Sequence, residues 1–202
     1  MIKQLSCRTV VADESTKKSS VLQVQSLRIS AYDSKWGTLT VDDDSILFRV
    51  SSEQHVDGFT VITSETPLQS FPPIFSLLFS QCTALYKRNY CCQQSALELY
   101  FHKGGYSDSL YLFFTERKIR DSAYRKIASR LPETAVIQKL GESNIDLMKR
   151  LKLDLQWQRG ELSNFDYLMR LNLIAGRSIQ DITQYPVFPW VLKHCGTSVD
   201  LK

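Results

Sequence analysis

The sequence predicts an α+β fold, in which an antiparallel β-domain closed by one helix is followed by a helical C-terminal segment. Several stretches between residues 21 and 114 alternate apolar and polar side chains, which is typical of strands with one buried face. The period then changes to that of an amphipathic helix over 115–131. After residue 156, a second helical stretch leads into an extended aromatic run.

Three strands are expected in the first half of the β-domain. Residues 21–29 alternate most regularly, and 36–41 and 45–50 are shorter strand candidates. Only the triplet Asp42-Asp43-Asp44 separates the latter two, so we expect an antiparallel hairpin there. Residues 51–73 contain three prolines and are interpreted as a long loop.

Three more strand candidates follow the loop. The first is 74–79, which we expect to continue through 84–90, and the others are 96–101 and 109–114. A polar loop containing Gly104-Gly105 separates the last two, which favours another antiparallel connection.

A helix is expected to begin after Thr115 as its N-cap and to end before Pro132. Its apolar positions recur every four residues: Ile119, Ala123, Ile127 and Leu131. Each such side chain contributes roughly 1.5–3 kcal/mol when buried, so we expect the helix to dock on the sheet. The opposite face carries cations that we interpret as solvated: Arg117, Lys118, Arg120, Arg125 and Arg130. Strands followed by one closing helix resemble the element order of a pleckstrin-homology (PH) domain, an antiparallel β-sandwich or barrel capped by a C-terminal helix.

Composition excludes several classes of function. The 25 Lys+Arg and 21 Asp+Glu give a net charge of +4, too mild to indicate nucleic-acid binding. No run approaches the roughly 18–20 apolar residues of a membrane span, and the start lacks a secretory h-region. The five cysteines include no C-x-x-C pair, so we expect reduced thiols, a cytoplasmic location and no metal. No phosphate loop, nucleophile elbow or catalytic histidine set is present, so we expect neither an enzyme nor a cofactor.

The C-terminal segment contains its own helix signals. Ser163 is a predicted N-cap with Asp166 in the first turn, and Gly176 occupies a C′ position. The stretch 185–190 contains two prolines and must be extended.

This segment closely resembles the opening of a BEACH domain. The residues that carry the resemblance are Trp157, Ser163, Asn164, Tyr167, Leu168, Leu171, Asn172, Ala175, Arg177, Asp181 and 184–190. In the PH-BEACH family, which includes neurobeachin, the lysosomal trafficking regulator and the factor associated with neutral sphingomyelinase activation, a divergent PH-like domain directly precedes BEACH. The polar, Ser-, Thr- and Lys-rich start predicts a flexible arm over 1–20, and 133–155 is interpreted as a linker with one marginal helix. The resemblance implies a PH-like domain over 21–132 and the first part of BEACH over 156–202. A whole BEACH domain is several times longer, so we expect only its N-terminal fragment here.

The resemblance implies a non-enzymatic scaffold or adaptor in vesicle trafficking, lysosome-related or autophagy processes, cytoplasmic or peripheral on endomembranes. Its partners would be the BEACH domain of the same protein, other trafficking proteins and, weakly, a membrane surface, but no nucleic acid. We expect the following residues at protein interfaces: Lys87, Arg88, Tyr90, Trp157, Arg159, Asn164, Phe165, Tyr167, Asn172, Arg177, Tyr185, Phe188 and Trp190. The aromatic members either meet a partner surface or form a local core.

The alternative function is a phosphoinositide- or membrane-binding PH module. PH domains grip phosphoinositides with several basic residues on the first hairpin. Here residues 32–37 contain one, Lys35, and the next turn is triply acidic. The sequence therefore favours the scaffold over the lipid-binding module.

Overall fold

The computed structural model describes residues 21–51, 74–101 and 108–188. The expected arm over 1–20, nearly all of the loop over 51–73, and Trp190 lie outside these residues. No helix in the described ranges is long and apolar enough to cross a membrane.

One bent sheet forms the body of the molecule, with the strand order β4-β3-β2-β1-β7-β6-β5-β8. Its strands are β1 (Leu22–Ile29), β2 (Lys35–Val41), β3 (Ser45–Val50), β4 (Ile74–Leu78), β5 (Cys82–Tyr90), β6 (Gln93–Phe101), β7 (Ser109–Phe113) and β8 (Val136–Ile137). All neighbours are antiparallel except β8, which runs parallel to β5. The predicted hairpin is confirmed, with Val41 opposite Ile46.

The expectation that 74–79 continues into 84–90 as one strand is wrong. A 3-10 turn, Phe79–Gln81, interrupts the chain between β4 and β5. β4 then pairs with β3, whereas β5 pairs with β6 at the other end of the strand order. This turn carries the chain from one half of the bent sheet to the other, and the buried Phe79 anchors it in the core.

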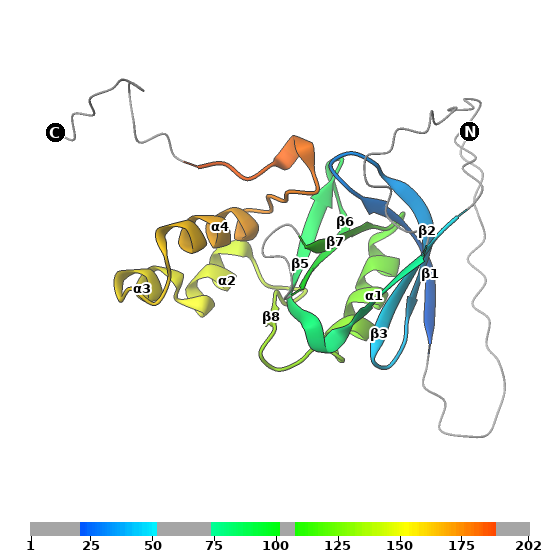
Figure 1. The fold of residues 1–202 in the computed structure, drawn as a ribbon, viewed down its shortest axis with the longest axis horizontal. Coiled ribbons are helices and arrows are strands. Elements are labelled where there is room, and N and C mark those ends of the chain that lie inside the picture. The colour runs from blue at the N-terminus through cyan, green and yellow to red at the C-terminus, as the bar shows by residue number, and fades with distance from the viewer. Residues whose placement is uncertain (1–20, 52–73, 102–107, 189–202) are drawn as a thin grey trace.

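Helix α1 (Arg117–Ala128) lies across the opening of the bent sheet (Figure 1). Its residues Ala123, Tyr124 and Ile127 join the core that lies between the sheet and the helix. The α+β class and the PH-like arrangement of strands and closing helix are as predicted from the sequence.

Two details of α1 differ from the prediction. The N-cap is Glu116, whose side chain makes no capping hydrogen bond, so Thr115 is not the cap. The helix also ends at Ala128, with Ser129 as C-cap, before Pro132 can act as the terminator.

The cationic face of α1 is not wholly solvated. Arg120 is only 3% exposed, and its Nε lies 2.7 Å from the Asp121 carboxylate. Arg130, just beyond the helix, pairs with Asp43 at 2.6 Å. The turn between β2 and β3 therefore has a cationic neighbour from the closing helix.

Residues 133–155 are more ordered than a linker with one helix. They contain β8, then α2 (Asn144–Leu151) and the start of α3 (Leu153–Gln158), with Lys152 in the left-handed conformation between the helices at φ 50°. Helix α4 (Asn164–Ile174) and a 3-10 turn (Ile182–Gln184) follow. The predicted ends of α4 are confirmed, since Ser163 Oγ accepts the Asp166 N–H and Gly176 has φ +91°. The domain boundaries themselves stay a prediction.

Candidate interdomain interface

The outer face of β5 and β6 is covered by the C-terminal helices. Alternation along β6 sends Leu97 and Leu99 into the core under α1, and Tyr100 to the opposite face. On that face, a second apolar cluster consists of Ala84, Tyr86, Tyr100, Leu147, Leu153, Leu173 and Ile174. Figure 1 shows α2, α3 and α4 on the side of β5 opposite to α1. The PH-like sheet thus separates two hydrophobic cores.

A buried ion pair lies at the edge of this second core. Arg88 Nε donates to Glu98 Oε2 at 2.6 Å, and the two side chains are 1% and 0% exposed. Arg88 Nη1 donates to the Leu173 carbonyl at 2.8 Å, and Ser178 Oγ donates to Glu98 Oε1 at 2.6 Å. Ser109 Oγ of β7 completes the set with a 2.8 Å bond to the same carboxylate oxygen. One ion pair therefore ties β5, β6 and β7 to the end of α4 and to the segment that follows it.

The low-polarity surroundings shift several pKa values here. Burial alone would lower the pKa of Arg88, but the neighbouring Glu98 outweighs it and the net shift is upward. Burial, and then the Glu98 charge, raise the pKa of Tyr100 well above its ordinary value. Both groups keep their ordinary forms at neutral pH, so the network holds one cation and a neutral phenol. Arg88 Nη2 and the Tyr100 hydroxyl have no hydrogen-bond partner among the described residues.

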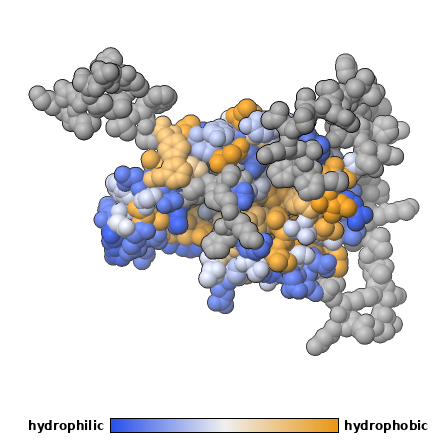
Figure 2. Space-filling model, in the orientation of Figure 1, coloured by the Kyte–Doolittle hydropathy of each residue, from blue (hydrophilic) through white to orange (hydrophobic). Residues whose placement is uncertain are grey.

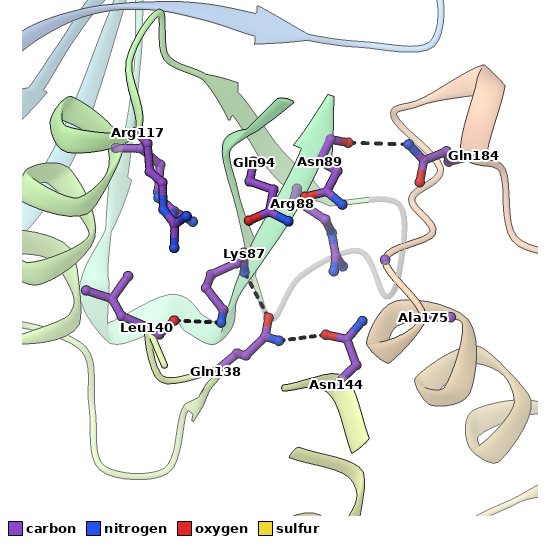
Figure 3. Close-up of a pocket in the computed structure, with 12 residues that line it drawn as sticks. Lys87, Arg88, Asn89, Gln94, Arg117, Gln138, Leu140, Asn144, Ala175 and Gln184 are labelled. Carbon is purple, nitrogen blue, oxygen red and sulfur yellow. Dashed lines mark hydrogen bonds between the residues drawn. The ribbon is translucent and has the colours of Figure 1, made fainter. Parts of the chain in front are cut away.

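A second polar connection uses Lys87 and Gln138. Lys87 Nζ donates to the carbonyls of Leu140 and Glu142 at 2.9 and 2.7 Å. Gln138 continues the edge pairing of β8, because its N–H donates to the Leu85 carbonyl and its Oε1 accepts the Lys87 N–H. Gln138 Nε2 then donates to Asn144 Oδ1 at 2.8 Å (Figure 3). The edge of β5 is therefore bonded to the chain that enters α2.

The aromatic side chains of the BEACH-like segment stack in pairs. Trp157 lies on Tyr167 with ring centroids 5.0 Å apart, and its Nε1 donates to Asn164 Oδ1. Phe165 stacks on Phe188 at 5.7 Å. Yet Trp157, Phe165 and Phe188 are 41%, 56% and 42% exposed. Figure 2 shows hydrophobic surface near the C-terminal end of the described chain. These pairs leave apolar surface available to a partner.

The extended stretch after the 3-10 turn is fastened to α4. The Asn172 side chain brackets Val187, donating from Nδ2 to its carbonyl and accepting its N–H at Oδ1. Arg177 Nη1 donates to the Tyr185 carbonyl at 3.1 Å. The sequence-predicted residues Asn172, Arg177, Tyr185 and Phe188 therefore lie together.

Two other predicted residues lie elsewhere. Tyr90 packs against Tyr111 and Phe113 in a small separate cluster. Arg159 is exposed, and Glu161 lies 3.9 Å from it. Their role at an interface stays a prediction.

Sequence reasoning missed four residues that hold the interface together. These are Glu98, Gln138, Ser178 and Tyr86. Glu98 could have been found, because it lies between Leu97 and Leu99 in a strand whose sequence predicts burial of both faces. A carboxylate in such a strand needs a partner. No comparable local signal marks Gln138 or Ser178, because their partners are distant in the sequence.

Within the described ranges, no group of three or more His, Cys, Asp or Glu side chains is placed to hold a metal ion. The arrangement that the structure does provide is a packed, hydrogen-bonded joint between a sheet and helices.

Comparisons with known proteins find similarity to the C-terminal part of the chain and to the chain as a whole. Residues 155–202 match the family model described as Beige/BEACH domain. Two putative neurobeachin homologs, from Caenorhabditis elegans and Caenorhabditis briggsae, are each 36% identical over 118 residues. That alignment covers 54% of this chain and 4% of each relative, so the chain spans a small part of their length.

Solved structures of low sequence identity also resemble the chain. One is the Slm1-PH domain in complex with inositol-4-phosphate, with a TM-score of 0.39 and 11% identity over 57% of this chain and 99% of that one. Another is the C-terminal domain of an unknown protein from Leishmania infantum, with a TM-score of 0.39 and 16% identity over 55% of this chain and 84% of that one. Residues 155–202 thus resemble part of a BEACH domain and follow a PH-like sheet, and the chain is similar to putative neurobeachin homologs.

Proposed function

We propose that this chain is part of a non-enzymatic trafficking scaffold. In it, the PH-like sheet packs against the BEACH domain and forms the interface between the two domains. The supporting observation is the Arg88–Glu98 pair, whose further bonds include those to Leu173 and Ser178 of the BEACH-like segment. A buried ion pair is favourable only when its other hydrogen bonds are made, so this pair requires both parts to be in place. Roles in lysosome-related processes and autophagy, with partners among other trafficking proteins, belong to this proposal.

The stacked aromatic pairs support the next step of the proposal. Phe165 and Phe188 are held rigidly by stacking and by the Asn172 bracket, but about half of each ring stays exposed. Rigid, half-exposed aromatic rings lose little conformational entropy on association. We propose that the remainder of the BEACH domain covers them.

Complementation in trans tests this proposal. The 202-residue chain is mixed with a polypeptide that carries the remainder of a neurobeachin-homolog BEACH domain, and affinity is measured by calorimetry. Phe165→Ser is expected to weaken association at least tenfold, because truncating a central aromatic anchor costs about 2 kcal/mol or more. Tyr32→Ser is the matched control, since Tyr32 is 98% exposed on the opposite part of the chain. No association, or equal effects of the two changes, contradicts the proposal.

The first hairpin supports a protein-binding role over phosphoinositide recognition. Lys35 Nζ already pairs with Asp33 at 2.9 Å, and Asp43 in the next turn pairs with Arg130. A phosphate approaching this hairpin would meet carboxylates as well as cations. We therefore propose that membrane contact through the hairpin is weak and peripheral.

A further inference from the structure

A basic cavity of about 310 Å³ lies at the edge of β5, between the start of α1 and the end of α4. Its lining comprises four cationic side chains, five amide side chains and three small or apolar residues. The cations are Lys87, Arg88, Arg117 and Arg120, and the amides are Asn89, Gln94, Gln138, Asn144 and Gln184. None of the described residues that line the cavity is acidic. In Figure 3, Arg117 and Arg88 extend into the same space from α1 and β5.

The cations in this cavity are close enough to repel one another. Burial lowers the pKa of Lys87, and the charges of Arg120 and Arg117 lower it further, against an opposing effect of Glu142. Burial also lowers the pKa of Arg120, where Asp121 opposes the shift and Arg117 adds to it. Arg117 itself has no salt-bridge partner among the described residues. The site thus concentrates positive charge that the folded chain only partly neutralises.

The start of α1 adds to this field. Its first turn carries Arg117, Lys118 and Arg120 and no acidic residue, and the N-cap Glu116 makes no side-chain capping hydrogen bond. Backbone N–H groups at a helix start carry partial positive charge, so cations are unfavourable there and an anion is favourable. The buried Arg88 adds a guanidinium to the lining from the β5 side.

We propose that this cavity binds a phosphate-class anion, presented either by a phosphorylated solute or by a phosphorylated lipid headgroup. Guanidinium groups match phosphate oxygens with paired N–H donors, and the amides add neutral donors around them. The volume is at the lower end of those found for ligand pockets and suits one or two phosphate groups. The cavity lies between β5, α1 and the C-terminal segment, so the site rests on the docking of that segment that the proposed function also uses. It does not require the remainder of the BEACH domain.

Calorimetry with inorganic pyrophosphate at constant ionic strength tests the cavity in the 202-residue chain. Arg117→Gln is expected to weaken binding about tenfold or more, since it removes one charge-assisted contact. Lys118→Gln is the matched control, because it removes the same charge from the same helical turn outside the cavity lining. Arg117 is exposed, so its replacement leaves the fold intact, which a urea midpoint verifies.

A second pair of variants adds charge instead of removing it. Gln94→Glu places a carboxylate in the lining without deleting a cation, and is expected to weaken pyrophosphate binding. Gln93→Glu makes the same change at the adjacent exposed position, outside the lining, and is expected to leave binding within about twofold.

Vesicles distinguish the two sources of the anion. Phosphatidylcholine vesicles with and without phosphatidylinositol 4-phosphate are sedimented with the chain. Retention that pyrophosphate competes away and Arg117→Gln abolishes supports a lipid headgroup. Pyrophosphate binding without vesicle retention supports a soluble ligand. The proposal is overturned if neither probe binds, or if Arg117→Gln and Lys118→Gln weaken binding equally.

Discussion

At the scale of single residues, the Arg88–Glu98 pair is the most consequential feature of the chain. Both side chains are almost fully buried, and the surrounding bonds come from Leu173 and Ser178. Desolvation of two charges is expensive, so the pair is tolerated only while each charge has its partner. Removing one partner should therefore cost far more than removing a surface charge.

Glu98→Gln is expected to lower the free energy of unfolding by about 3–5 kcal/mol, because it leaves the Arg88 guanidinium buried and unpaired. Urea unfolding measures the loss. Glu161→Gln is the control, since Glu161 and Arg159 are exposed and 3.9 Å apart, and it should change stability by less than about 1 kcal/mol. If Glu98→Gln lowers the free energy of unfolding as little as the control does, burial does not make this ion pair more important for stability than an exposed one.

The buried thiol of Cys82 should make the stability of the chain depend on pH in the alkaline range. Burial raises the pKa of this thiol to about 12, against a smaller opposing effect of the backbone at Ala84 and Tyr100. Above pH 9 the unfolded chain loses this proton while the folded chain keeps it, so stability present below pH 9 is lost as pH rises toward 12. The slope from this group is about 1.4 kcal/mol per pH unit.

Urea unfolding between pH 8 and 11 under reducing conditions checks this expectation. Cys82→Ala should flatten the alkaline slope by about one proton, whereas the exposed Cys91→Ala should leave it unchanged. An unaltered slope in Cys82→Ala would assign the alkaline sensitivity to the buried tyrosines, whose pKa values burial also raises.

At the scale of elements, β6 and α4 differ in how far the local sequence accounts for their structure. From Ser95 to Phe101, every residue of β6 is buried, because the core under α1 covers one face and the C-terminal helices cover the other. Helix α4 instead follows its local signals closely, with a Ser163 cap and Gly176 at its end. Its C-terminal glycine can therefore be tested by itself.

Gly176→Ala should destabilise the chain by about 1 kcal/mol, since φ is +91° and an alanine there is strained although no atom obstructs its Cβ. Gly141→Ala is the matched control, because its Cβ also meets nothing within 4 Å and its φ is not positive. That change should be neutral or slightly stabilising. Thermal or urea unfolding compares them, and equal effects would mean that backbone strain does not govern the end of α4.

At the scale of the whole molecule, one sheet serves two hydrophobic cores. β5 and β6 contribute both to the inner core under α1 and to the outer core under the C-terminal helices. Disrupting the outer core should therefore also destabilise the inner core. Trp36 in β2 and Trp157 in α3 lie on opposite sides of this joint and can report on each part separately. The two parts are therefore expected to unfold together.

Leu153→Ala tests this coupling. The side chain is fully buried in the outer core, and its truncation should cost about 2–5 kcal/mol. In versions that retain only Trp36 or only Trp157, urea unfolding followed by fluorescence should show both midpoints falling by the same amount. Leu155→Ala on the same helix is the control, because Leu155 is 39% exposed. A shift confined to the Trp157 signal would show that the helices unfold independently.

Most of the local structure could be predicted from the sequence. The β2–β3 hairpin, the closing helix, the Ser163 cap and the glycine at the end of α4 depend on spacings of a few residues, which are visible in one dimension. The BEACH resemblance of the last segment is also a property of residue order.

Which surfaces meet depends on contacts between segments that are distant in the sequence. The break at Phe79–Gln81, the addition of β8 to the sheet and the burial of Arg120 depend on where distant segments cross. The same holds for Glu98, because Ser178 comes within hydrogen-bond distance of it only when α4 docks on the sheet. It also holds for Lys87 and Arg117, which line the same cavity from different elements. Burial and the distances between charges depend on non-local contacts, which the periodicity of the sequence does not predict.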